Sequence, residues 1–335
     1  MKKIRLGVIG TGIIVNEAHV PALLRLGDRY EITALCNRTP AKAQAVADRL
    51  GIGTDRLWQD WRAFLAEAPV EAVLVCLPIE LNFPASLAAA RAGKHVLCEK
   101  PVGQSLEETH QAVELASRFG ITYMVAEDCH FTPQFVKAAE LARSGAVGRV
   151  RAIQWNVLNF LALSDKYAQT VWRTRHVYPG GYVLDGGVHF VHVLQMIAGR
   201  ISRVRAETLS IEPGLGRVDT AFALLRHKNG VLSSLNMSWR TRLSGPEPLR
   251  IFGDEGSLAV SEKEIIRIDQ AGKEERIEFD KEDGYYQQLV EFHRAVTTCS
   301  PPSMTTESAA HDVEVILAIL EAAQKGTTVE LRAEN

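Results

Sequence analysis

Residues 4–15 read Ile-Arg-Leu-Gly-Val-Ile-Gly-Thr-Gly-Ile-Ile-Val, an apolar run that ends in two glycines one residue apart. The run before the glycines is typical of a buried β-strand, and a helical pattern follows them. Gly10 and Gly12 suit a tight turn whose backbone approaches a pyrophosphate at a helix N-terminus. Val15 stands where a third glycine is usual, and a plain turn is the alternative. We favour a dinucleotide-binding turn because it directly follows the first strand.

From this turn to about Ala126, short apolar runs alternate with helical patterns. The predicted strands are 4–9, 31–36, 72–77, 95–98 and 122–126, and the predicted helices are 20–26, 41–50, 81–92 and 106–119. Such alternation indicates a parallel sheet covered by helices on both faces. We therefore predict an N-terminal, doubly wound α/β domain of the Rossmann type over residues 1–126, which binds NAD(P).

After Gly145 the pattern changes to alternating β-rich segments separated by turn residues. The predicted strands are 151–158, 204–211, 220–226, 231–239, 250–252, 265–268 and 328–331, and the predicted helices are 182–198, 284–298 and 306–325. This pattern indicates an open antiparallel sheet. We predict a substrate-binding α+β domain over residues 127–335, whose closing helices can pack back on the first domain.

Composition narrows the class of protein. A chain of 335 residues exceeds what one core usually supports, and its net charge of −2 without a long basic run argues against a nucleic-acid partner. No run reaches the roughly 20 apolar residues that span a membrane, and Arg5 and Glu17 interrupt the only stretch that resembles a signal peptide. The five widely spaced cysteines suggest buried thiols in a reducing compartment, so a cytoplasmic location is expected.

The end of the second predicted strand bears on the choice of cofactor. An acid there would bind the ribose hydroxyls of NAD, but the sequence reads Cys36-Asn37-Arg38-Thr39. Without a carboxylate at Asn37 a 2′-phosphate is not repelled, and Arg38 can pair with it. We therefore favour NADP, with a solvated Arg38 at a helix start as the alternative.

Several motifs along the whole chain occur together. They are Gly10-x-Gly12, Gly93-Lys94-His95-Val96, Glu99-Lys100-Pro101, Trp172-Arg173, Gly180-Gly181, Asp185-x-x-x-His189 and Phe252-Gly253-Asp254-Glu255-Gly256-Ser257. Together they resemble the glucose–fructose oxidoreductase/inositol dehydrogenase (Gfo/Idh/MocA) family. The resemblance implies a Rossmann domain plus a large open antiparallel sheet whose exposed face serves as an oligomer interface, so a homodimer or homotetramer is expected.

Two positions depart from the family pattern. The family's frequent Pro-Asn-x-x-His loop reads Pro78-Ile79-Glu80-Leu81-Asn82 here, and the acid often found three residues after the motif histidine is His192. Both positions are expected near the pocket, so the substrate of this protein cannot be assigned from the family alone.

Three residues are the candidates for catalysis. Lys100 follows a strand at its carboxyl end, where ligands bind in open α/β sheets, and Pro101 restricts its backbone. Asp185 and His189 are four residues apart and share one face of a predicted helix, with His192 near the same face. We assign the general base to His189, the donor to the reacting oxygen to Lys100, and binding of a sugar hydroxyl to Asp185.

A metal site made of Asp185, His189 and His192 is an alternative that we do not favour, because the spacing lacks the usual zinc signature. A structural role is an alternative for each histidine. For the cofactor we predict contacts from Gly10, Gly12, Ile13, Ile14, Asn37, Arg38, Cys76, Leu77, Pro78, Asn82, Glu99, Lys100, Trp172 and Arg173. For the substrate we predict contacts from Lys100, Glu127, His130, Trp155, Arg173, His176, Tyr178, Asp185 and His189.

These features predict an enzyme that moves a hydride between NAD(P) and a carbinol of a sugar, polyol or sugar derivative. No tight basic cluster beyond Arg173, Arg175 and His176 is evident, which favours a neutral sugar or polyol; a sugar acid bound by those arginines is the alternative. The alternatives are an NAD-dependent glycosidase that acts by transient oxidation and a non-catalytic sensor of sugar or cofactor.

Overall fold

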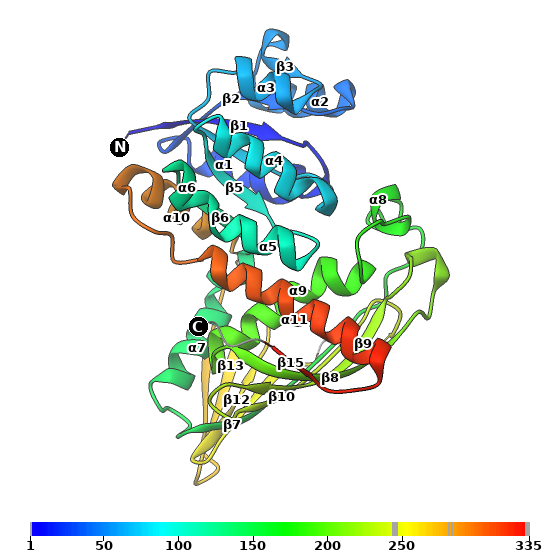
Figure 1. The fold of residues 1–335 in the computed structure, drawn as a ribbon. Helices are drawn as coiled ribbons and strands as arrows, with labels where there is room; N and C mark the ends of the chain where they lie inside the picture. Colours follow the sequence, from blue (N-terminus) through cyan, green and yellow to red (C-terminus); the bar gives the residue numbers. More distant parts are fainter. Residues whose placement is uncertain (1, 243–246, 281, 283, 332–335) are drawn as a thin grey trace. The chain divides into compact units, whose positions relative to one another are not determined.

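The structure, a computed structural model, describes residues 2–242, 247–280, 282 and 284–331. The chain forms two compact units, the first from Met1–Asp128 and Gly284–Ala310, the second from Cys129–Asp283 and His311–Asn335 (Figure 1). Each unit contains its own sheet, with six strands in the first and nine in the second.

The first unit is built on a parallel sheet with the strand order β3-β2-β1-β4-β5-β6. The strands are β1 Ile4–Ile9, β2 Tyr30–Cys36, β3 Leu57–Trp58, β4 Ala72–Val75, β5 His95–Glu99 and β6 Tyr123–Ala126. Every residue of β4 is buried, as expected for a central strand covered on both faces. The strand order reverses between β1 and β4, where the carboxyl ends of the strands flank a ligand crevice in sheets of this kind.

Two groups of helices cover this sheet. The helical elements are η1 Val15–His19, α1 Val20–Arg25, α2 Pro40–Leu50, η2 Thr54–Arg56, α3 Trp61–Glu67, α4 Ile79–Arg91, α5 Leu106–Val113, α6 Leu115–Phe119 and α10 Tyr285–Thr298. Helix α4 contacts α3, α5 and α6, whereas α10 contacts η1, α1 and β6. The hydroxyl of Tyr30 donates to the carbonyl of Leu289 at 2.6 Å, which fastens α10 to the start of β2. The first unit is therefore a doubly wound sheet that α10 completes.

The second unit is built on a sheet with the order β14-β13-β12-β11-β7-β10-β9-β8-β15. The strands are β7 Val150–Leu158, β8 Ile201–Leu209, β9 Thr220–His227, β10 Leu232–Ser238, β11 Leu249–Gly253, β12 Gly256–Val260, β13 Glu264–Asp269, β14 Glu274–Glu278 and β15 Val329–Glu330. The pairs are antiparallel except at the centre, where β7 and β10 run parallel. The sheet is open and mostly antiparallel.

Helices cover one face of this sheet. The remaining helical elements are η3 Asp128–Phe131, α7 Pro133–Arg143, α8 Val171–Thr174, α9 Gly181–Ala198, η4 Pro213–Leu215 and α11 Thr306–Lys325. Figure 1 shows α9 and α11 on the same side of the strands, and α9 contacts β9 and β10. In β9, Ala221, Ala223 and Leu225 are buried, whereas the alternate residues Phe222 and Leu224 are exposed. The opposite face of the sheet is therefore open.

The predicted fold class is confirmed, although several elements differ from the prediction. Helices α3 and α7 and strands β3, β12 and β14 were not predicted. The helix predicted over 106–119 is divided into α5 and α6 at Glu114. The second sheet is mostly antiparallel, as predicted, but β7 and β10 pair in parallel, and β8 and β9 lie between these two strands in sequence.

Among the described residues, no helix combines the length and the apolar character needed to cross a bilayer.

Candidate functional site

The glycine turn after β1 combines a close backbone contact with an open space. Gly10 has a φ of 92°, and a Cβ atom there would collide with the carbonyl oxygen of Cys76 at the end of β4. A Cβ atom at Gly12 would meet no heavy atom within 4 Å. Gly10 is thus required by the packing of the protein itself, whereas Gly12 leaves room beside the start of the helix that follows.

The helix after the turn contains an unusual stretch. Helical backbone begins at Ile13, and residues Val15–His19 form a π-helical turn before α1. The side-chain amide of Asn16 donates to the carbonyls of Gly12 at 2.9 Å and Thr11 at 3.2 Å, which ties the turn to the helix. Single π-turns inside helices occur often at functional sites.

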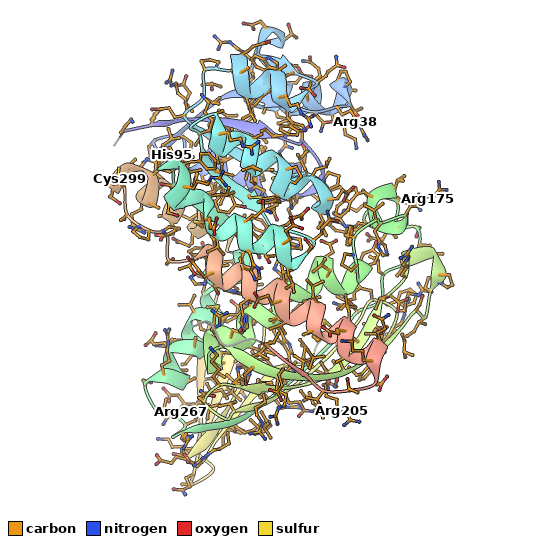
Figure 2. All side chains as sticks on the ribbon, in the orientation of Figure 1. Arg38, His95, Arg175, Arg205, Arg267 and Cys299 are labelled. Atoms are coloured by element: carbon orange, nitrogen blue, oxygen red, sulfur yellow. The ribbon has the colours of Figure 1, made fainter. Side chains whose placement is uncertain are left out.

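Asn37 links the end of β2 to the glycine turn. Its side-chain amide donates to Thr11 Oγ1 at 2.8 Å, and its Oδ1 accepts from the N–H of Thr39 at 2.8 Å. Arg38 is exposed beside it, at the surface of this unit (Figure 2), and forms no ion pair with any residue that the structure describes. Asn37 therefore shapes the loop, and the guanidinium of Arg38 is available to a ligand.

Lys100 lies at the same edge of the sheet as this turn. It is half-buried and follows β5 directly, two strands away from β1 in the sheet order, and its bond to Pro101 is cis. Cys76, Leu77 and Pro78 follow β4 between them and are also half-buried. Because the carboxyl ends of parallel strands meet at one edge, the turn, the β4 end and Lys100 belong to one side of the unit.

Asn82 holds the backbone on both sides of Lys100. Its side-chain amide donates to the carbonyl of Glu99 at 3.0 Å and to that of Pro101 at 3.3 Å, and the residue is only 1% exposed. Asn82 lies in the first turn of α4, at the position where the family's motif after this strand often has a histidine. Within this unit Asn82 is a positioning residue for the Lys100 backbone.

His19 anchors the same strand end from the other side. Its Nε2 lies 2.7 Å from Glu99 Oε1, and the two side chains are 0% and 8% exposed. The thiol of Cys76 lies within 4.8 Å of both groups, and burial together with the Glu99 carboxylate raises the pKa of that thiol well above its usual value. Because His19 and Glu99 bind each other, this cluster fixes the segment before Lys100.

In the second unit, α9 carries Asp185 and His189. The helix begins at Gly180 and Gly181, which both have positive φ values, and its Gly186 and Gly187 pack against Trp239, Met237 and Ile316. A Cβ atom at either of these two inner glycines would overlap those side chains. The close approach of α9 to the sheet therefore depends on the glycines between Asp185, which is buried, and His189, which is half-buried.

Arg173 pairs with Asp185. Its Nε donates to Asp185 Oδ2 at 2.7 Å, and the two side chains are 15% and 10% exposed. The guanidinium also lies 4.0 Å from the centroid of the Trp172 ring and 5.0 Å from that of Tyr167. The Trp172-Arg173 pair thus holds the carboxylate of Asp185 in place, a role that the sequence motif alone does not reveal.

His192 binds two other side chains of the second unit. Its Nδ1 lies 2.8 Å from Asp312 Oδ2 and its Nε2 lies 3.0 Å from Nδ1 of His130, so both ring nitrogens are hydrogen-bonded. The geometry argues against the alternative of a metal bound by Asp185, His189 and His192. It also connects His130, one of the predicted substrate contacts, to the buried interior of the second unit.

Three other predicted substrate contacts, His176, Trp155 and Glu127, are buried. Nδ1 of His176 donates to the carbonyl of Tyr178 at 2.8 Å, and its Nε2 accepts from the N–H of Arg217 at 3.1 Å. Trp155 is 8% exposed and packs edge-on against Phe135 and Phe190. Both residues have the contacts of structural groups. Glu127 follows β6 in the first unit and is 1% exposed.

Two residues near the predicted site were missed from the sequence. His19 and Asp312 bind Glu99 and His192 across 80 and 120 residues of chain, respectively. Neither residue belongs to a local motif, so only the folded chain reveals their contacts.

The first unit is a doubly wound sheet with a glycine turn and a lysine at the same edge, and the second unit contains a half-buried histidine. These are features of an NAD(P)-dependent oxidoreductase. The family models agree: an oxidoreductase family with an NAD-binding Rossmann fold matches residues 4–127, and the Gfo/Idh/MocA C-terminal domain matches residues 135–259. The chain belongs to the Gfo/Idh/MocA family of oxidoreductases, and it is an NAD(P)-dependent dehydrogenase or reductase that acts on CH–OH groups.

Individual relatives cover nearly the whole chain. D-xylose 1-dehydrogenase (NADP(+)) 2 of Haloferax volcanii is 31% identical over 97% of this chain and 99% of its own length. Myo-inositol 2-dehydrogenase of Thermotoga maritima is 24% identical over 90% of this chain and 91% of its own. The crystal structure of an oxidoreductase from Thermotoga maritima superposes with a TM-score of 0.92 at 31% identity and covers 98% of each chain.

Proposed function

We propose that this protein reversibly transfers a hydride between NADP and a carbinol of a neutral sugar or polyol. The observation that carries the proposal is the shared sheet edge in the first unit. There the open glycine turn after β1 and the half-buried Lys100 after β5 lie two strands apart. A lysine at that edge is suited to act on a substrate beside a bound dinucleotide.

The residues of the glycine turn fit a dinucleotide. The space beside Gly12 adjoins the start of a helix, where backbone N–H groups and the helix dipole favour a pyrophosphate. Ile13 and Ile14 would supply these N–H groups, and the segment Cys76–Pro78 would border the nicotinamide half. When bound, the cofactor supplies the acceptor for the hydride.

Asn37 and Arg38 support the choice of NADP. The side chain of Asn37 is engaged by Thr11 and Thr39, so no carboxylate occupies the place that would repel a 2′-phosphate. The exposed guanidinium of Arg38 pairs with that phosphate. One of the relatives, the xylose dehydrogenase, is NADP-dependent by name.

His189, Lys100 and Asp185 have different roles in the proposed oxidation. The C–H bond of the carbinol breaks with both electrons leaving as hydride, and the hydroxyl proton moves to a ring nitrogen of His189 as the C=O bond forms. Lys100 Nζ donates a hydrogen bond to the same oxygen and stabilises its developing negative charge. Asp185, held by Arg173, accepts a hydrogen bond from a neighbouring sugar hydroxyl.

The substrate class follows from the charges near these groups. The guanidinium of Arg173 is already paired with Asp185, which leaves it poorly suited to bind a phosphate or a carboxylate. A neutral, hydroxyl-rich substrate is consistent with the names of the xylose and inositol dehydrogenases.

The open face of the second sheet supports a homodimer or homotetramer. Phe222, Leu224 and Leu232 are 46%, 64% and 48% exposed and project from neighbouring strands β9 and β10. Arg205, opposite Leu224 in β8, lies on the same face, away from α9 and α11 (Figure 2). An apolar centre with charges around it is typical of an interface between protein chains.

The state of the thiols supports a cytoplasmic location. All five cysteines lie within the described residues and form no disulfide there, and burial raises the pKa of Cys98 to about 12. Cysteines without disulfides are usual in a reducing compartment.

Titration with NADPH and NADH, followed by nicotinamide fluorescence, tests the cofactor. The better cofactor is then assayed with a panel of neutral sugars and polyols. We expect NADPH to bind at least tenfold more tightly, and Arg38→Gln to remove most of this preference. We expect Lys100→Met to lower kcat about 100-fold or more with little change in cofactor affinity.

The exposed Lys263 offers a matched control, because Lys263→Met removes the same charge from a β-turn of the second unit. This variant should keep full activity. Failure of both cofactors to bind, or full activity of Lys100→Met, would contradict the proposal.

A further inference from the structure

The side chain of Asn16, in the helix that follows the glycine turn, is hydrogen-bonded at both ends of its amide. Its Nδ2 donates to the carbonyls of Gly12 at 2.9 Å and Thr11 at 3.2 Å, and its Oδ1 accepts from Nη1 of Arg49 at 2.9 Å. A carbonyl oxygen can only accept and a guanidinium can only donate. These partners therefore determine which end of the amide faces the turn and which end faces Arg49.

The two carbonyls that Asn16 binds determine the direction of the next two N–H groups. The peptide bonds after Thr11 and Gly12 are trans. In a planar trans peptide the C=O of one residue and the N–H of the next point in opposite directions. Because the carbonyls of Thr11 and Gly12 are directed at Asn16, the N–H groups of Gly12 and Ile13 point away from it.

These two N–H groups lie at the start of a helix. Helical backbone begins at Ile13, and the first N–H groups of a helix have no acceptor within it. A Cβ atom at Gly12 would meet no heavy atom within 4 Å, so there is room for a ligand beside the turn. A phosphate group is the ligand that successive N–H groups at such a place bind, provided that the backbone holds them in one direction.

A valine at the third position of the glycine motif changes how the helix start is held. Val15 is 0% exposed and begins the π-helical turn Val15–His19. A glycine at this position would allow the helix to pack closely on the strand before the turn. In this chain the side chain of Asn16, the next residue, ties the helix start to the turn.

Arg49 connects this arrangement to α2. It is an exposed residue in the last turn of α2, and its Nη1 also donates to the backbone carbonyl of Asn16 at 3.3 Å. Asn37, which precedes α2, donates to Thr11 Oγ1 at 2.8 Å. The glycine turn is thus held from both ends of α2, and the bond from the charged guanidinium is of the stronger, charge-assisted kind.

We propose that Asn16, held by Arg49, is the positioning residue that directs the N–H groups of Gly12 and Ile13 at the pyrophosphate of the cofactor. The proposal rests on the proposed hydride transfer with NADP and specifies what sets the strength of the phosphate site. Asn16 acts through the backbone of the turn, and Arg49 acts through Asn16.

Cofactor titrations of the full-length protein test the assignment. Asn16→Leu removes the amide at similar volume, and Asn16→Asp keeps the acceptor for Arg49 but not the donors to the two carbonyls. We expect both variants to bind NADPH about tenfold or more weakly, measured by nicotinamide fluorescence. Adenosine 2′-phosphate, which has no pyrophosphate, should compete with an affinity within about twofold of normal. If NADH is the tighter cofactor, NADH and adenosine replace this pair of ligands. An equal loss for both ligands would indicate a general structural role and overturn the proposal.

A double-mutant cycle tests whether Arg49 acts through Asn16. Arg49→Met should weaken NADPH binding about threefold or more, and Arg49→Lys should recover part of that loss. In the Asn16→Leu background, Arg49→Met should add less than about a further twofold. Fully additive losses would mean that Arg49 acts on the phosphates by its own charge, and would overturn the proposal.

Arg91→Met is the matched control, because Arg91 is an exposed arginine in the last turn of another helix of the first unit, α4. It should leave the affinities for both ligands unchanged. With saturating NADPH, kcat of every folded variant should stay within about twofold of normal, since only cofactor binding is altered.

Thermal unfolding verifies that each variant folds, and the exposed Arg49 keeps the test valid if the Asn16 variants do not. Unchanged NADPH affinity in folded Asn16→Leu, or in Arg49→Met, overturns the assignment while the oxidoreductase function stands. Failure of the unmodified protein to bind either cofactor instead overturns the proposed function.

Discussion

The Nε atom of Arg173 lies 2.7 Å from Oδ2 of Asp185, and both side chains are largely shielded from water. An ion pair in such a setting gains strength from the low local dielectric, and removal of one partner leaves the other charge poorly solvated. Arg173 also stacks on Trp172, so the Trp172-Arg173 motif in α8 and the motif on α9 act together. The carboxylate of Asp185 is consequently held in a defined orientation before any substrate binds.

Arg173→Met should therefore reduce both stability and turnover. We expect a loss of about 3 kcal/mol in the free energy of unfolding, since the buried carboxylate loses its counter-charge. Arg173→Lys keeps the positive charge but not the planar guanidinium. Its stability and turnover should lie between those of Arg173→Met and the unmodified protein. Thermal unfolding and steady-state kinetics measure both effects. Equal stability of Arg173→Met and the unmodified protein would show that the pair is not stabilising.

Gly10 and Gly12 should respond differently to the same substitution. Gly10→Ala places a Cβ against the Cys76 carbonyl at a positive φ, so we expect destabilisation of at least about 2–3 kcal/mol. Gly12→Ala fills open space and should change stability by less than about 0.5 kcal/mol. It should nevertheless weaken NADPH binding at least tenfold, because the methyl group occupies the place of the pyrophosphate. Tight NADPH binding by Gly12→Ala would place the cofactor elsewhere.

Asn82 offers a test of how the Lys100 backbone is held. Asn82→Leu keeps the approximate volume but leaves the carbonyls of Glu99 and Pro101 without this donor. We expect a loss of about 1–3 kcal/mol in stability and a fall in kcat that exceeds any change in NADPH affinity.

Asn82→His is the matched variant, because it introduces the residue that the family often has in this loop and restores one N–H donor. It should recover part of the lost kcat. Normal kcat in Asn82→Leu would mean that the Lys100 backbone is held without these two hydrogen bonds.

Local patterns were sufficient to predict the parts of the site that depend on neighbours in sequence. The apolar run before Gly10 and the Asp185–His189 spacing each express a local geometry, a strand-to-helix turn and one helix face. Helix α7 could also have been predicted, because Thr132-Pro133 is a typical helix start and Ala138 and Ala139 lie on its buried side.

Other features depend on contacts between distant segments and leave no local signal. The parallel pairing of β7 with β10 depends on how β8 and β9 are inserted between them in sequence. The sequence of any one strand does not show this arrangement. Strand β14 reads Glu-Glu-Arg-Ile-Glu and lies at a sheet edge, so it lacks the apolar alternation of a central strand. The His192–Asp312 contact likewise requires the folded chain, since α9 and α11 are far apart in sequence.

The open face of the second sheet should control the oligomeric state. Leu224→Glu places a charge at the centre of the exposed apolar residues of β9 and β10, opposite Arg205 in β8. We expect this variant to shift the protein from oligomer to monomer in light scattering after size-exclusion chromatography. Leu106→Glu, at an exposed apolar position in the first unit, should leave the mass unchanged. A monomeric unmodified protein would rule out this role of the sheet.

Acid should destabilise the second unit through His227. Burial lowers the pKa of this histidine below its usual 6.5, while Nδ1 donates to the Gly199 carbonyl at 2.6 Å and Nε2 accepts from Ser233 Oγ at 2.8 Å. Because the unfolded chain then binds the proton more readily than the folded one, the stability is complete above about pH 6.5 and is lost as the pH falls from there through the lowered pKa. Thermal unfolding between pH 8 and pH 5 should therefore show a decline that begins near pH 6.5 and is shallower in His227→Gln. The exposed His110 serves as the control, since His110→Gln should keep the full decline. An identical pH dependence in His227→Gln and the unmodified protein would assign the acid sensitivity to other groups.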